Sequence, residues 1–190
     1  GLDPTVIIGG HLKNISANAR LGKGDFLVAE ADESDRSLLH LQSSLAIVTN
    51  IDFEHAETYK DLHEVKETFY RFLCNLPFYG KAFLCADDQE IRSMLPIVHI
   101  KTVLYGLHQD AHIRAETIDL HPEHSTFDVL YYGKKLGKVS LNLPGIHNVT
   151  NALAAIALAR DLEIPFDKIA RALSNFAGLA RRFSSRVTFA

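Results

Sequence analysis

The sequence has 190 residues, and its 20 lysines and arginines set against 23 aspartates and glutamates give a formal net charge of −3. This balance argues against a nucleic-acid-binding protein that relies on a strong positive field. Apolar residues make up 47% of the chain, which excludes a disordered protein and predicts one large domain with a buried core.

The first part of the chain contains three short apolar runs that have the composition of buried strands, at residues 5–8, 26–31 and 45–51. Together they predict a parallel sheet. Between Asp61 and Leu76 apolar residues recur every three or four positions, and Asp61 with Glu64 has the spacing of a capping box, which predicts an amphipathic helix. The alternation typical of α/β proteins continues with a strand, a short helix and a strand, at 82–85, 88–95 and 101–105.

The period of the apolar residues changes to two between His112 and Leu143, which predicts antiparallel strands. Helical spacing then returns twice and a last strand is expected, at 149–162, 166–176 and 186–189. The expected fold class is therefore α/β, a mostly parallel sheet flanked by helices with a small antiparallel sheet inserted at about residues 110–144. Since no linker divides the chain, we expect residues 1–190 to form one domain.

Two features predict a cytoplasmic protein that does not enter a membrane. The longest apolar stretch, residues 152–159, is far shorter than the roughly 20 residues of a membrane span. Cys74 and Cys85 lie in apolar surroundings without metal-ligand spacing, and we expect both to be buried thiols in a reducing compartment.

Four carboxylates lie at the carboxyl end of the second predicted strand, at Glu30, Asp32, Glu33 and Asp35. In open α/β sheets ligands bind at the carboxyl ends of the strands, and clustered carboxylates there suit a hard divalent cation. The alternative is a solvated acidic loop that caps a following helix at 37–41.

The next predicted strand ends in a similar pattern, with Asp52, Glu54 and His55. Two neighbouring strands would then deliver a carboxylate and an imidazole to one rim. Such a rim fits Mg²⁺ or Mn²⁺, with positions left for water and phosphate oxygens.

A second polar group, His147, Asn148 and Asn151, follows Gly145 at the start of a predicted helix. Amides can read the edge of an adenine and an imidazole can stack on it. The alternative is that Asn148 is simply the N-cap of the helix.

A third group, Arg181 and Arg182, follows Gly178 near the end of the sequence. Paired guanidinium groups suit a phosphate, although two solvated surface arginines would look the same. A phosphate loop of the form G-x-x-x-x-G-K-[ST] is absent from the sequence, because no Gly-Lys pair is followed by Ser or Thr.

The motifs EADESD, TNI followed by H and TY, PG-HN-xxN and GLARRF occur here in one order and spacing. In these motifs, over nearly its whole length, the sequence resembles the central domain of the Mur ligases of peptidoglycan synthesis, and within that family the branch that adds L-alanine. The resemblance implies a cytoplasmic three-domain enzyme, in which ATP phosphorylates the lactyl carboxylate of UDP-N-acetylmuramate and the amine of L-alanine then displaces phosphate. It also implies that this chain is a fragment, inactive alone, which lacks the phosphate loop and the N- and C-terminal domains.

The resemblance assigns the site residues to three groups, with Glu30 and His55 as ligands of Mg²⁺ (or Mn²⁺), His147, Asn148 and Asn151 around the adenine of ATP, and Arg182 near the terminal phosphates. His55, through the metal, and Arg182 would stabilise the charge on the transferring phosphoryl group, so no side-chain nucleophile is expected. Lys66 lies about one turn away from the position at which several relatives carry a carbamylated lysine, so we expect no such modification.

Two rival interpretations remain open on the sequence alone. The first is a noncatalytic binding or assembly module that kept the Mur ligase scaffold and lost the phosphate loop. The second, a metal-dependent hydrolase, is weaker, because it would leave the amide pair and the arginine loop without a role.

Overall fold

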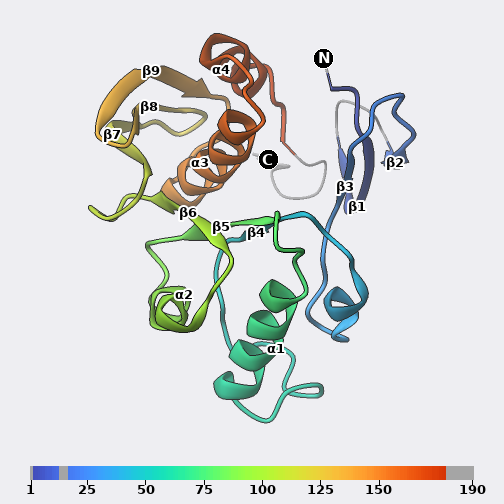
Figure 1. The fold of residues 1–190 in the computed structure, drawn as a ribbon. Helices are drawn as coiled ribbons and strands as arrows, with labels where there is room; N and C mark the ends of the chain where they lie inside the picture. Colours follow the sequence, from blue (N-terminus) through green and yellow to red (C-terminus); the bar gives the residue numbers. More distant parts are fainter. Residues whose placement is uncertain (1, 13–16, 179–190) are drawn as a thin grey trace, which may run out of the picture.

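A computed structural model describes residues 2–12 and 17–178. Within them the chain forms a six-stranded sheet of order β4-β5-β6-β7-β8-β9 and a three-stranded sheet of order β2-β1-β3 (Figure 1). The strands are β1 (Thr5–Leu12), β2 (Ala17–Arg20), β3 (Leu27–Ala29), β4 (Leu45–Val48), β5 (Lys81–Cys85), β6 (Lys101–Gly106), β7 (Ile113–Leu120), β8 (Ser125–Tyr131) and β9 (Lys134–Leu141). The mixed α/β class predicted from the sequence is confirmed.

The six-stranded sheet is parallel from β4 to β7 and antiparallel from β7 to β9. The antiparallel strands, expected as a small inserted sheet, instead continue the parallel one. The junction is short: Tyr105 and Gly106 at the end of β6 pair with Ile113 and Arg114 at the start of β7. The change of period in the sequence therefore marks a change of strand direction within one sheet.

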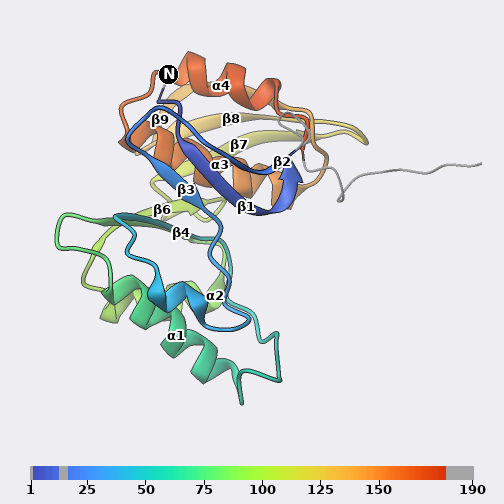
Figure 2. The same cartoon turned by 90° about the vertical axis from the view of Figure 1, so that its right-hand side faces the viewer.

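Helices cover both faces of the six-stranded sheet. Figure 2 shows α1 (Leu62–Cys74) and α2 (Gln89–Met94) on one side, and α3 (Ile146–Asp161) and α4 (Phe166–Ser174) on the other. The predicted start of α1 is confirmed, because the Asp61 carboxylate accepts a hydrogen bond from the Glu64 backbone N–H at 2.9 Å. No described helix is both long and apolar enough to cross a bilayer.

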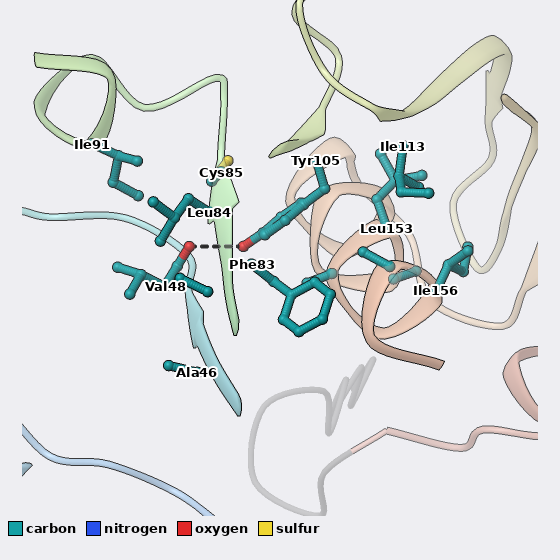
Figure 3. Packing of buried hydrophobic residues seen from close by; sticks show 14 of the residues in the cluster. Ala46, Val48, Phe83, Leu84, Cys85, Ile91, Tyr105, Ile113, Leu153 and Ile156 are labelled. Carbon is teal, nitrogen blue, oxygen red and sulfur yellow. Dashed lines mark hydrogen bonds between the residues drawn. The ribbon is translucent and has the colours of Figure 1, made fainter. Parts of the chain in front are cut away.

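The core lies between β5 and the helices on either side of it (Figure 3). Phe83 points toward α3 and Leu84 toward α2, as alternate residues of a strand do, and both are almost fully buried. The Tyr105 hydroxyl donates to the Val48 carbonyl at 3.0 Å, which ties β6 to β4 across β5. Burial raises the pKa of Tyr105, so this donor stays protonated.

The two cysteines differ in their environment. Cys85 on β5 is buried, as predicted, whereas Cys74 is exposed at the end of α1. The prediction was wrong for Cys74 because its apolar neighbours in the sequence, such as Phe72 and Leu73, occupy the buried face of the helix and Cys74 does not.

The three-stranded sheet stands beside the larger one (Figure 1). β1 and β3 pair in parallel, as expected, but β3 is not the buried strand that its composition predicts, because Leu27 and Val28 are 61% and 46% exposed. In the described part of the chain β3 pairs with β1 alone and β4 with β5 alone, so each leaves one edge open. The last predicted strand, 186–189, lies outside the described residues.

Candidate functional site

Glu30 stands directly after β3 and is fixed to the neighbouring strand. Its backbone N–H donates to the Ile7 carbonyl, and its carboxylate accepts a hydrogen bond from the Gly9 backbone N–H. A Cβ at position 9 would lie only 3.0 Å from the Glu30 carboxylate oxygen, so this close approach suits a glycine. Glu30 is exposed to solvent at the carboxyl end of the strand, where the sequence placed it.

His55 lies in the loop between β4 and α1, with a backbone φ of 57° in the left-handed region. The imidazole is 33% exposed and lies between two carboxylates. Its Nε2 is 3.5 Å from Glu33 Oε1, and its Nδ1 is 3.4 Å from Glu57 Oε1. The residue of the acidic loop that contacts His55 is therefore Glu33, whereas the carboxylate of Glu30 contacts Gly9.

A cavity of about 160 Å³ connects the two predicted strand ends. Glu33 of the acidic loop lines it together with Asp52 and Glu54 after β4, and Phe69 and Phe72 of α1 close its apolar side. Acidic residues after two strands thus line one cavity, but β3 and β4 belong to separate sheets, so the prediction that they are neighbours in one parallel sheet is wrong.

The donor set of this rim has the chemistry that a magnesium or manganese ion requires. Carboxylate oxygens and one imidazole suit Mn²⁺ or Mg²⁺, and Mg²⁺ is commonly held by one or two protein carboxylates, with water and phosphate oxygens completing the octahedron. Among the residues that the structure describes, no three His, Cys, Asp or Glu side chains converge on one point. The pairing of Glu30 with His55 as ligands of one ion stays a prediction.

Two other acidic residues of the loop accept hydrogen bonds from backbone N–H groups. The Asp32 carboxylate accepts from the Ser34 backbone N–H, and Asp35 accepts from the Ser37 backbone N–H at the start of the 3₁₀ helix η1 (Ser37–His40), both at 2.8 Å. The side-chain hydroxyls of Ser34 and Ser37, followed by their backbone N–H groups, lower the pKa of Asp32 and of Asp35, respectively. The Asp35 carboxylate thus bonds to the first residue of η1, as the alternative of a capping loop predicts, whereas the Asp32 carboxylate bonds within the loop.

Three residues that the sequence reasoning missed join the acidic loop to the His55 loop. The hydroxyls of Thr58 and Tyr59 donate to the backbone carbonyls of Ser34 and Glu33, respectively. Arg36 donates to the Thr58 carbonyl at 2.8 Å. The only sequence signal for these contacts was the TY pair itself, which gives no indication of its partners.

The second predicted group lies at the start of α3. Gly145 is the N-cap, with φ 93°, so the alternative that Asn148 is the N-cap is wrong. Asn148 nevertheless bonds to the preceding backbone, since its side-chain amide donates to the Pro144 carbonyl at 2.6 Å. His147 and Asn151 are exposed, within the first two turns of the helix.

Two further sequence predictions concern positively charged residues. Arg182 and Arg181 lie outside the described residues. Lys66 donates its ammonium to the Glu90 carboxylate at 2.8 Å and to the Ser93 hydroxyl at 2.6 Å, so it is engaged between α1 and α2.

Comparisons with a family model and with curated relatives point to the same protein family. The model of the Mur ligase middle domain matches residues 11–159. The chain is 50% identical over 98% of its length to UDP-N-acetylmuramate--L-alanine ligase of Syntrophotalea carbinolica, and 52% identical over 96% of its length to the enzyme of that name from Azoarcus sp.. It spans 41% and 40% of these relatives, respectively.

Solved structures of two ligases have the same fold. UDP-N-acetylmuramate-alanine ligase of Thermotoga maritima superposes with a TM-score of 0.81 at 29% identity, over 96% of this chain and 40% of that one. UDP-N-acetylmuramate:L-alanyl-gamma-D-glutamyl-meso-diaminopimelate ligase from Neisseria meningitides superposes with a TM-score of 0.84 at 28% identity, over 95% of this chain and 60% of that one.

Proposed function

The chain belongs to the Mur ligase family, and on that premise we propose that it is the ATP-binding middle domain of an enzyme that joins L-alanine to UDP-N-acetylmuramate. The observation that supports this proposal is the acidic rim, where carboxylates that follow β3 and β4 line one cavity and one of them, Glu33, lies 3.5 Å from His55. The relatives that are about 50% identical over nearly the whole chain support the choice of L-alanine.

In this function the rim residues orient the reacting groups. Glu30 and His55 would hold Mg²⁺ (or Mn²⁺), which when bound neutralises charge on the phosphates of ATP and on the carboxylate that attacks them. His147, Asn148 and Asn151 would hold the adenine, and Arg182 would stabilise the terminal phosphates.

The proposed reaction has two steps. A lactyl carboxylate oxygen attacks the γ-phosphorus of ATP, the bond to the β-γ bridging oxygen breaks, and ADP leaves. The amine of L-alanine then attacks the acyl carbon, phosphate leaves with the bonding electron pair, and the amine gives up a proton as the amide forms. Because ATP supplies the leaving group, the protein contributes positioning and charge stabilisation.

The direct test uses the longest natural protein that contains these 190 residues. We expect phosphate release from ATP that depends on both UDP-N-acetylmuramate and L-alanine. Replacing L-alanine with the tripeptide L-alanyl-γ-D-glutamyl-meso-diaminopimelate distinguishes the two kinds of ligase that the fold resembles. Preference for the tripeptide would contradict the L-alanine assignment.

The 190 residues alone are expected to bind Mg-ATP weakly. The sequence holds no phosphate loop, whose backbone N–H groups supply the strongest contacts to the β- and γ-phosphates. Isothermal titration should give a dissociation constant in the millimolar range or no measurable heat. Tight binding would favour the rival interpretation of a binding module that holds nucleotide in its own way.

A further inference from the structure

Two consecutive hydroxyls bind two consecutive carbonyls at the rim. The Tyr59 hydroxyl donates to the Glu33 carbonyl and the Thr58 hydroxyl to the Ser34 carbonyl, each at 2.5 Å. Tyr59 is 1% exposed, so its ring is anchored in the core while its hydroxyl reaches the acidic loop. Side chains of the His55 loop are therefore bonded to the backbone of the acidic loop.

Arg36, in the acidic loop, adds further contacts between the two loops. Its guanidinium lies 4.9 Å from the centroid of the Tyr59 ring and forms an ion pair with Glu64 of α1 at 2.7 Å. Arg36 and His55 both have φ near +60°, a conformation that persists in such residues only where the surroundings hold it. We call Arg36, Thr58 and Tyr59 the latch.

We propose that Tyr59 and Thr58 are positioning residues, which hold the acidic loop against His55 and thereby set the affinity of the rim for a divalent cation. The inference rests on the proposed function, which gives the rim its cation. Its physical basis is that Glu33 takes part twice: its carbonyl accepts from Tyr59, and its carboxylate lies 3.5 Å from His55 Nε2. Moving the backbone of Glu33 therefore moves the carboxylate that orients the imidazole.

Tyr59→Phe removes only the hydroxyl and keeps the buried ring. Tyr79→Phe is the matched control, because Tyr79 is 63% exposed and lies after α1, away from the rim. Both variants are made in the 190-residue chain, with circular dichroism to verify the fold. Two quantities are measured by NMR: the exchange rates of the Arg36 and Leu38 amides, which donate within the loop, and the broadening of loop signals by Mn²⁺.

Tyr59→Phe should raise these exchange rates at least about tenfold and weaken Mn²⁺ binding by about tenfold or more. Tyr79→Phe should change neither. A Tyr59→Phe chain that binds Mn²⁺ as tightly as the parent would overturn the proposal, and so would unchanged exchange rates.

His55→Ala separates this failure from a failure of the proposed function. If Mn²⁺ broadening disappears in His55→Ala but is unaffected by Tyr59→Phe, the positioning role alone is wrong. If broadening of the loop signals survives His55→Ala, His55 is not a ligand of the cation, and the proposed metal site falls together with the role of the latch in it.

Discussion

At the scale of single residues, His112 connects two strands through its side chain. Its Nδ1 accepts a hydrogen bond from the Leu104 backbone N–H at 3.0 Å, and its ring stacks on Tyr132 with centroids 4.7 Å apart. Nδ1 can accept only when it carries no proton, and burial lowers the pKa of His112. The folded chain therefore disfavours the protonated imidazole.

This arrangement predicts a pH dependence of stability. Because the pKa of His112 is lower in the folded chain than in the unfolded one, the unfolded state takes up a proton first as the pH falls below about 6.5. The contribution of His112 is complete above that pH and is lost as the pH falls toward the folded pKa. Urea unfolding at pH 7.5 and 5.5 measures the loss, and His112→Gln should make it smaller. An equal loss in His112→Gln would show that the histidine is not responsible.

Gly106 is required by a close contact at the end of β6. Its φ is 143°, and a Cβ there would lie 2.7 Å from the carboxylate of Asp87, which accepts from the Leu107 and His108 backbone N–H groups. Gly106→Ala would add backbone strain and push this carboxylate off its donors, so we expect a loss of about 2–4 kcal/mol in unfolding free energy.

Gly133→Ala is the matched control for this substitution. Gly133 also has a positive φ, 76°, but a Cβ there would meet no atom within 4 Å. It should lose only about 1–2 kcal/mol, the cost of the left-handed conformation. Equal losses in the two variants, measured by urea unfolding, would show that the contact with Asp87 contributes nothing.

At the scale of elements, local signals predicted the helices well. The start of α1 depends on Asp61 and Glu64, three residues apart, and its buried face on apolar spacing within thirteen residues. Strand burial and pairing depend on contacts distant in sequence, which no local pattern contains. For this reason the sequence identified β3 as a strand but did not show that it is exposed. It also did not show that β7 to β9 continue the parallel sheet.

The two sheets should differ in local stability. β5 is covered by helices on both faces, whereas β3 leaves Leu27 and Val28 exposed. We expect backbone amides of residues 27–29 to exchange with solvent about 100-fold faster or more than those of 82–85. Native-state hydrogen exchange measures both in one sample. Equal protection would mean that the three-stranded sheet opens only when the whole chain unfolds.

At the scale of the whole molecule, the sequence indicated which segments carry the acidic residues of the rim, but not how the strands before them are arranged. Acids at the ends of two predicted strands pointed to a shared rim, and the structure places those strands, β3 and β4, in separate sheets. Which carboxylate lies against His55 depends on the path of the loop: it is Glu33, whereas Glu30, which the resemblance pairs with His55 as a metal ligand, accepts from Gly9. The latch depends on side chains more than twenty residues apart in the sequence and was invisible to it.

The central claim is that Glu30 and His55 serve a divalent cation in an ATP-dependent ligation. Its most direct test is the Mg²⁺ dependence of phosphate release by the whole protein that contains this chain, with ATP, UDP-N-acetylmuramate and L-alanine present. Glu30→Ala and His55→Ala should each lower turnover by about 100-fold or more, with normal unfolding curves. His63→Ala, at an exposed histidine on α1, should keep turnover unchanged. Near-normal turnover at low Mg²⁺ in either rim variant would contradict the claim.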